Sequence, residues 1–367
     1  MFVLDSHCDT PSQIHRLRDM SQDDAHSHVD YPKLRRSVLD AAFFALYVPA
    51  AMKEEEAYSY ARILLSELKE SVAGVSDFVF ADSVEEAVDN KSKGLFSIFI
   101  GLENGSPIGK DLSLLEEFRR EGVRYMTLCH SADNEICDSC ASGTRWHGLS
   151  PFGREVIRKM NEIGMLVDVS HASDDTFYDV LRFSAVPVVA THSCCRALSA
   201  HPRNMTDDMI CALADKGGVI QINFYPLFLD MSFSRILAES GLEERGDSIE
   251  AEFIAAPSDP LKRQAWYEIL DALSALERPS YTLIADHVEH VVRLVGVDHV
   301  GLGSDFDGIC VTPSGMEDVT CFGAVLDELR RRGYPEEAIA KIAGGNFLRV
   351  MKAAEEYSNA CAASVGE

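Results

Sequence analysis

Short apolar segments recur along this sequence, and most are separated from the next by a segment with helical spacing. Eight such segments can be counted, at residues 2–4, 41–48, 95–102, 123–128, 165–169, 186–190, 219–224 and 300–303. Short apolar strands that alternate with amphipathic helices are typical of a parallel sheet buried on both faces. Eight such units predict an α/β fold, a distorted (β/α)8 barrel of the TIM type.

An open doubly wound sheet is the alternative fold. It would need a glycine-rich turn after the first strand to bind a nucleotide, but Asp5-Ser6-His7 follows instead. The length of 367 residues suits one barrel with additions. We therefore expect a single domain over residues 1–367.

One stretch, at about residues 226–279, breaks the alternation of strands and helices. It is acidic, partly helical and too long for a simple loop after the seventh strand. We expect an insertion here, on the face of the barrel that carries active sites. A lid, a dimer element and a plain surface elaboration remain alternatives for it.

Composition excludes several classes of partner. The formal net charge is -25 and the pI is about 4.8, so nucleic acid and anionic membranes would be repelled. We find no apolar run near the roughly 18 residues of a membrane helix and no features of a signal peptide. The ten cysteines, several of them inside apolar segments, suit reduced thiols. Together these features predict a cytoplasmic protein.

Six of the eight predicted strands end in a residue that can bind a metal or transfer a proton. These residues are His7 and Asp9, Glu103, His130, His171, His192 and Asp305. In an α/β barrel the carboxyl ends of all strands meet at one face, so the side chains are expected to converge there. Imidazole and carboxylate ligands without thiolates suit Zn2+ or a similar divalent ion. There are more donors than one ion needs, which favours two metal ions that share a bridging carboxylate. Such a pair of ions is typical of metal-assisted hydrolysis.

Nine short motifs, in order, resemble the membrane (renal) dipeptidase family of zinc dipeptidases, peptidase family M19, among the amidohydrolase-like barrels. They include Asp-Ser-His-Cys-Asp-Thr-Pro at residues 5–11, Leu-Glu-Asn-Gly at 102–105, Asp-Val-Ser-His at 168–171 and Gly-Ser-Asp-Phe-Asp-Gly at 303–308. The others lie at 124–130, 148–153, 191–193, 202–205 and 223–225. Cys8, Asn104 and Cys194-Cys195 depart from the family pattern, and none of them removes a ligand.

The resemblance implies a role for each site residue. His7 and Asp9 would bind one zinc, His171 and His192 the other, and Glu103 would bridge the two ions. The remaining roles fall to His130 for the oxyanion, Arg203 for the substrate carboxylate, Asp305 for proton transfer and contact with the substrate's amino end, and Tyr225 for lining the pocket.

The resemblance also implies an activity: hydrolysis of small dipeptides with free termini, including those with a D-residue at the carboxyl end. A metal-bridging hydroxide would attack, and Asp305 would deliver the proton to the leaving amine. We expect two zinc ions, a homodimer, and no nucleic-acid or membrane partner. The alternatives are another metal hydrolase on the same barrel, namely a lactonase, deaminase or cyclic-amide hydrolase, or a non-catalytic metal-binding protein.

Three other groups could be mistaken for metal sites. Cys137 and Cys140 have the spacing of half a zinc ribbon, but we find no second pair. His287 and His290 lie three residues apart, which suits the face of an outer helix. The polar residues between 12 and 37, including His26 and His28, are expected to form a solvated loop.

Overall fold

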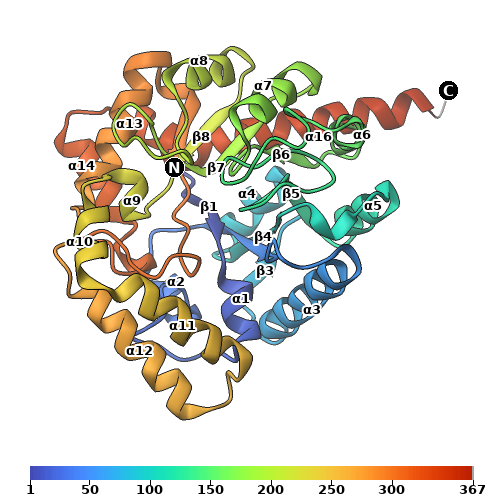
Figure 1. Cartoon of the computed structure of the whole chain (residues 1–367). Coiled ribbons are helices and arrows are strands. Elements are labelled where there is room, and N and C mark those ends of the chain that lie inside the picture. Colours follow the sequence, from blue (N-terminus) through green and yellow to red (C-terminus); the bar gives the residue numbers. More distant parts are fainter. Residues whose placement is uncertain (366–367) are drawn as a thin grey trace.

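The computed structural model describes residues 1–365, and its centre is a nearly closed barrel of eight parallel strands surrounded by helices (Figure 1). The strands pair in chain order, which confirms the predicted barrel. They are β1 Leu4–Cys8, β2 Ala41–Tyr47, β4 Phe96–Glu103, β5 Val123–Thr127, β6 Leu166–Asp168, β7 Val189–Ser193, β8 Val219–Ile222 and β9 Val300–Leu302.

The barrel closes where the first strand meets the segment after the last one. Cys8 at the end of β1 forms a parallel bridge with Phe306. The N–H of Asp305 donates to the carbonyl of His7 (3.0 Å), and the N–H of Asp9 donates to the carbonyl of Phe306 (2.8 Å). The seam of the barrel therefore passes through the predicted site.

A ninth strand, β3 Phe78–Phe80, was not expected from the sequence. It pairs in parallel with Phe96 to Ile98 of β4. β5 pairs with β4 further along, from Ile100 to Glu103. Three residues are too short a run to show a strand period.

Helices follow most strands, and polar caps fix several of their starts. Ser150, Ser173 and Thr206 each accept a hydrogen bond from the backbone N–H three residues on. The α-helices of the barrel wall are α3 Glu54–Val72, α4 Val84–Ser92, α5 Leu112–Arg120, α6 Pro151–Glu162, α7 Asp174–Phe183, α8 Asp207–Asp215, α13 Thr282–Val295, α14 Gly323–Arg331, α15 Glu336–Ala340 and α16 Asn346–Val365. Short helical turns lie at Ser106–Ile108, Val297–His299, Val319–Cys321 and Lys341–Gly345.

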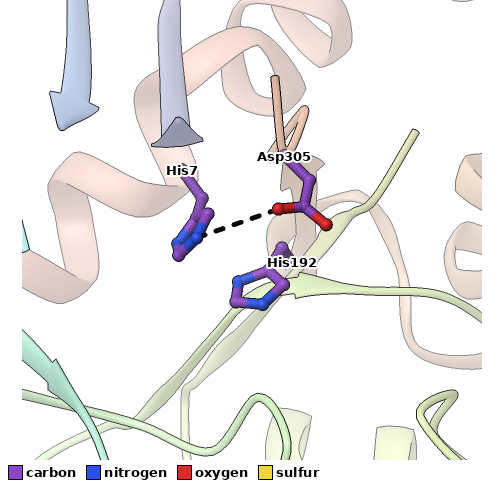
Figure 2. A group of neighbouring side chains, drawn as sticks. All are labelled: His7, His192 and Asp305. Atoms are coloured by element: carbon purple, nitrogen blue, oxygen red, sulfur yellow. Dashed lines mark ion pairs between the residues drawn. The ribbon is translucent and has the colours of Figure 1, made fainter. Parts of the chain in front are cut away.

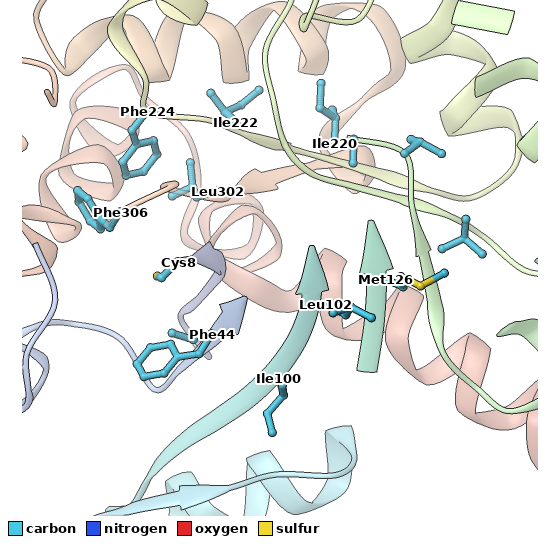
Figure 3. Packing of buried hydrophobic residues seen from close by; sticks show 14 of the residues in the cluster. Cys8, Phe44, Ile100, Leu102, Met126, Ile220, Ile222, Phe224, Leu302 and Phe306 are labelled. Carbon is cyan, nitrogen blue, oxygen red and sulfur yellow. The ribbon is translucent and has the colours of Figure 1, made fainter. Parts of the chain in front are cut away.

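The two faces of the strands pack into two apolar clusters. Along β2, Phe44 and its alternate neighbours join the cluster that includes Leu64 of α3 (Figure 3). Phe43 packs on Phe99 of β4 and, edge to face, on Phe347 of α16. The first turns of α16 thus help to fill the lower part of the barrel, which leaves the carboxyl ends of the strands for polar side chains.

The segment between β1 and β2 is only in part the solvated loop that the sequence suggested: residues 21–23 are exposed, but the rest is more ordered. It contains α1 Thr10–His15 and α2 Tyr31–Arg36. Asp30 caps α2 and is fully buried, because the Lys33 ammonium (3.3 Å) and the Ser27 hydroxyl (2.7 Å) satisfy its carboxylate. Polar residues that pair with one another in this way can be buried without an apolar pattern.

Between β8 and α13 the chain forms four helices, α9 Pro226–Leu229, α10 Phe233–Ser240, α11 Leu242–Ala255 and α12 Pro260–Ser274. They enclose an apolar cluster of their own around Phe253 and Trp266. The last two lie beside the β1–β2 segment (Figure 1), where Arg16 pairs with Glu250 of α11 and His26 stacks on Tyr267 of α12. Among the described residues, we find no helix with the length and apolar character needed to cross a membrane.

Candidate metal centre

The predicted donors converge at the carboxyl ends of the barrel strands. His7 comes from β1, Glu103 ends β4, and His192 lies in β7. Nε2 of His171 lies 3.0 Å from Nε2 of His192, and Nε2 of His7 lies 3.9 Å from Oδ1 of Asp305. Figure 2 shows His7, His192 and Asp305 pointing toward one another from different elements. Residues almost 300 positions apart in the sequence therefore face one small volume.

The Glu103 carboxylate lies between two groups of histidines. Its Oε1 is 3.1 Å from Nε2 of His171 and 3.4 Å from Nε2 of His192. Its Oε2 is 3.5 Å from Nε2 of His7, which is itself 3.5 Å from Oδ2 of Asp9. Each carboxylate oxygen thus faces a different set of donors, which is the arrangement that a carboxylate shared by two cations requires.

The donor set fits metal ions better than it fits the protein alone. Among the described residues, His7 Nε2, Asp9 Oδ1 and His130 Nδ1 are buried polar atoms without a hydrogen-bond partner. Such atoms are costly unless something satisfies them. Nitrogen and carboxylate donors of this kind suit divalent ions of the zinc type.

Burial and charge act strongly on the ionisation of this cluster. Burial alone would raise the pKa of Glu103, but the charge of His7 and hydrogen bonds from His171 and His192 hold it well below its usual range. Burial and the neighbouring Glu103 raise the pKa of Asp9. Burial lowers the pKa of both His171 and His192. The lowered pKa values favour the neutral imidazole, which is the form that binds a metal.

A second layer of side chains orients the histidines. The Tyr125 hydroxyl forms a hydrogen bond with Nδ1 of His7 (2.8 Å), and Thr191 Oγ1 does the same for Nδ1 of His192 (2.9 Å). Thr191 Oγ1 in turn donates to the buried carboxylate of Asp168 (2.7 Å), which also accepts from Thr127 Oγ1 (2.5 Å). These contacts leave both Nε2 atoms facing the centre. Partners of this kind commonly fix the ring orientation of a histidine that binds a metal.

Asp305 has a backbone conformation that few non-glycine residues adopt. Its φ is +64°, and His171 shares this left-handed conformation with a φ of +67°. Such residues cost about 1–3 kcal/mol each and cluster at functional sites. The Asp305 Oδ2 accepts a hydrogen bond from Nδ2 of Asn223 (2.9 Å). The carboxylate is thereby held at the edge of the donor cluster.

The residues expected to contact substrate surround the same volume. The His130 ring lies 4.1 Å from the ring of His171 and packs edge to face on Tyr47 (4.8 Å). Burial lowers the pKa of His130. Arg203 is nine-tenths buried, and its guanidinium donates to the carbonyl of His192 (3.0 Å), while its Nε has no partner among the described residues.

Tyr225 immediately precedes α9, next to Asn223. Its ring packs edge to face on Phe228 (5.0 Å), and the Arg203 guanidinium lies over the Phe228 ring (5.3 Å). Burial, together with the negative charges of nearby groups that include Asp305, raises the pKa of Tyr225. Tyr225 is therefore close to the site, although we find no direct contact with the donor cluster among the described residues.

Two other histidines of the sequence analysis lie outside the cluster. His287 Nδ1 accepts from the N–H of Cys195 (3.0 Å), and its Nε2 donates to the carbonyl of Leu229 (3.1 Å). His290 pairs with Asp207 (2.7 Å). Cys137 and Cys140 are free thiols. Among the described residues, none of these four belongs to the donor cluster.

Sequence reasoning did not single out the supporting residues Tyr125, Asp168 and Asn223. All three lie within the motifs at residues 124–130, 168–171 and 223–225. Their position inside these motifs was the only available signal, because their partners lie far away in the sequence.

A parallel barrel with this donor set at the carboxyl ends of its strands defines a class, the metal-dependent hydrolases. Comparison with known proteins gives the family. A sequence model described as membrane dipeptidase, peptidase family M19, matches residues 1–365. Dipeptidase aclJ of Aspergillus oryzae is 31% identical over 361 residues, which cover 96% of this chain and 76% of that protein. The chain belongs to the membrane dipeptidase family and is a metallo-dipeptidase.

Solved structures agree with this assignment. The probable dipeptidase PvdM from Pseudomonas aeruginosa is 27% identical, with a TM-score of 0.82 over 97% of this chain and 96% of that one. A metallo peptidase from Rhodobacter sphaeroides, solved with a phosphinate mimic of the dipeptide L-Ala-D-Ala, has a TM-score of 0.78 at 22% identity and shares the fold over 96% of this chain and 99% of that one.

Proposed function

We propose that this protein is a zinc-dependent dipeptidase that uses two Zn2+ ions to hydrolyse small dipeptides with free termini. The observation that carries the proposal is the position of Glu103. Its two carboxylate oxygens face separate donor groups, His171 with His192 on one side and His7 with Asp9 on the other.

Each group of donors would hold one ion, and Glu103 would be shared between them. Metal ions at these positions supply an activated water and polarise the scissile carbonyl. The four imidazole donors of the site, from His7, His130, His171 and His192, favour zinc over a harder cation such as magnesium.

The protein's own residues would bind and orient the substrate. A dipeptide ends in a carboxylate only a few bonds from its peptide group, so a cation must lie beside the metals. Arg203 meets this requirement, because it is anchored on the His192 carbonyl and retains an unused Nε. A planar guanidinium suits a carboxylate. Tyr225, close to Asp305 and Arg203, would line the pocket.

His130 and Asp305 would act on the reacting atoms. A neutral His130 ring can donate one hydrogen bond to the oxygen that becomes negative as the carbonyl is attacked. The Asp305 carboxylate, 3.9 Å from His7 Nε2, would take a proton from the attacking water and deliver it to the leaving amine. It would also contact the amino end of the substrate.

We extend the proposal to three further properties. A D-residue at the carboxyl end would be accepted, which is supported by the L-Ala-D-Ala mimic in the Rhodobacter sphaeroides protein of the same fold. Residues 1–367 would form one domain, with 226–279 as an insertion. Two chains would associate as a homodimer, which sedimentation equilibrium would test.

A panel of L,L and L,D dipeptides tests the activity. The purified protein is stripped of metal, reloaded with zinc in defined steps, and assayed for the released amino acids. We expect turnover to depend on about two equivalents of zinc. Activity on lactones, cyclic amides or amino-substituted bases in place of dipeptides would assign another hydrolase reaction. Zinc binding without any turnover would indicate a binding protein.

A further inference from the structure

Asp307, two residues after the proposed proton-transfer residue Asp305, forms a buried ion pair with Arg18. The side chain of Asp307, two positions after Asp305, is almost completely buried. Its Oδ1 accepts from Nη1 of Arg18 (2.7 Å), and its Oδ2 accepts from Oγ1 of Thr10 (2.9 Å). A carboxylate at this depth needs such partners, and the three residues come from opposite ends of the sequence.

The backbone of Asp307 is held as firmly as its side chain. Its N–H donates to Nδ1 of His28 (3.0 Å), and its carbonyl accepts from Nε2 of Gln13 (2.9 Å). Asp307 has a φ of +66°, so it shares the left-handed conformation of Asp305. Two left-handed residues separated only by Phe306 need restraint from their surroundings.

Backbone hydrogen bonds of Phe306 and Gly308, the residues on either side of Asp307, also restrain Asp305. Phe306 is tied to the seam of the barrel by the N–H of Asp9 (2.8 Å), and the N–H of Gly308 donates back to the carbonyl of Asp305 (3.1 Å). A Cβ atom on Gly308 would lie 2.1 Å from Oδ2 of Asp9 and 2.8 Å from Oδ1 of Asp305. The Asp305 carboxylate from the turn and the Asp9 carboxylate from the end of β1 therefore both lie against Gly308, and the turn has little room to shift.

We propose that Asp307, paired with Arg18, is a positioning residue that holds the turn at Asp305 and thereby aims the Asp305 carboxylate at the metal centre. The inference rests on the proposed function of Asp305. It also assigns a role to residues 10–28, which supply Thr10, Gln13, Arg18 and His28 to this network.

The test uses the zinc-loaded full chain and three variants, Asp307→Asn, Arg18→Met and the double variant. We expect each single variant to lower kcat about a hundredfold, the effect of a small misplacement of a reacting group. KM should change less than about threefold, and bound zinc should stay at the wild-type level. The double variant should be no slower than the slower single variant, because both changes break one interaction.

Glu328→Gln is the matched control. Glu328 is a buried carboxylate on α14 that accepts hydrogen bonds from Arg331 and Arg332 (2.6 and 2.7 Å), outside the donor cluster. Its loss should lower the melting temperature without a change in kcat. An unchanged kcat in Asp307→Asn would overturn the proposal, and so would a loss of activity that only parallels a loss of bound zinc.

Crystal structures of the wild type and Asp307→Asn separate this proposal from the proposed function. We expect the variant to lose the left-handed φ of Asp305 and its hydrogen bond from Asn223. If the wild type hydrolyses no dipeptide, the proposed function fails, but this comparison still decides the positioning role. A variant in which Asp305 keeps its conformation and its Asn223 contact would contradict the role.

Discussion

The hydroxyl of Tyr125 lies 2.8 Å from Nδ1 of His7, and the two rings are nearly parallel at an interplanar angle of 19°. If Nε2 of His7 binds a metal, Nδ1 must carry the proton and donate it to Tyr125. Because Tyr125 is fully buried in the barrel, its hydroxyl has a fixed position. The hydroxyl therefore selects both the tautomer and the orientation of the His7 ring.

Tyr125→Phe removes this contact while it keeps the ring. We expect zinc affinity at the site of His7 and Asp9 to fall about tenfold to a hundredfold, the usual effect of losing such a supporting partner. Competition with a chromophoric chelator measures the affinity. Tyr31→Phe is the control, because it also removes a buried tyrosine hydroxyl contact, to Ser71 (3.0 Å), but outside the donor cluster. Equal affinities in the two variants would contradict the role of Tyr125.

Gly101→Ala is expected to displace the same tyrosine. A Cβ atom on Gly101 would lie 2.2 Å from Cζ and 2.5 Å from the hydroxyl of Tyr125. The variant should lose about 1–3 kcal/mol of stability and show the weakened zinc binding of Tyr125→Phe. Gly246→Ala in α11 is the control, since its nearest neighbour would be Ile269 at 3.4 Å. It should be neutral or slightly stabilising in a urea titration.

Asp305→Asn keeps the shape of the side chain but removes its ability to carry a proton. We expect kcat to fall at least about a hundredfold while the fold and zinc content persist. Steady-state kinetics, circular dichroism and metal analysis check these three quantities. Turnover at the wild-type rate would remove Asp305 from the reaction.

Arg203→Ala should raise KM about tenfold to a hundredfold, because a charged hydrogen bond to the substrate carboxylate is lost. The sharper measurement compares free and C-terminally amidated forms of one dipeptide. The wild type should strongly prefer the free acid, and the variant should not distinguish the two. A preference that survives the substitution would place the carboxylate elsewhere.

The pH dependence of stability should reveal His287. Burial lowers its pKa to about 4 from the ordinary 6.5, so between these values the unfolded chain binds a proton that the folded chain does not. The free energy of unfolding should therefore fall as the pH drops from about 6.5 to about 4, by about 3 kcal/mol from this residue alone. Urea titrations of the wild type and His287→Gln across this range measure it. Parallel curves would show that His287 makes no such contribution.

The barrel and the gathering of its donors could be predicted from the sequence because both follow from local patterns. His7, Glu103, His171 and His192 all lie at or next to strand ends, and barrel geometry alone brings strand ends together. The contact of Tyr125 with His7 spans 118 residues, and that of Asn223 with Asp305 spans 82. Such pairings depend on strand register and side-chain direction, which no local pattern contains.

The segment between β1 and β2 shows a different reason for failure. Its buried residues are polar, and Lys33, Asp30 and Ser27 satisfy one another rather than packing as an apolar stripe. Arg18 reaches Asp307 across 289 residues. The hydrophobic pattern therefore predicts that this segment is exposed to solvent. In the structure, however, its Arg18 holds Asp307 next to the donor cluster.

The seam that joins His7 to Asp305 also affects how the enzyme is made. On a ribosome, β1 emerges well before Ser304, whose N–H donates to the Asp5 carboxylate (2.8 Å) and which follows 299 residues later. At typical synthesis rates of about 5–20 residues per second, the first strand waits roughly 15–60 seconds for this partner. The proposed metal ligands His7, Asp9, Glu103, His171 and His192 are therefore all synthesised before the closing strand β9, and we expect hydrolytic activity only once this strand and Asp305 have joined β1.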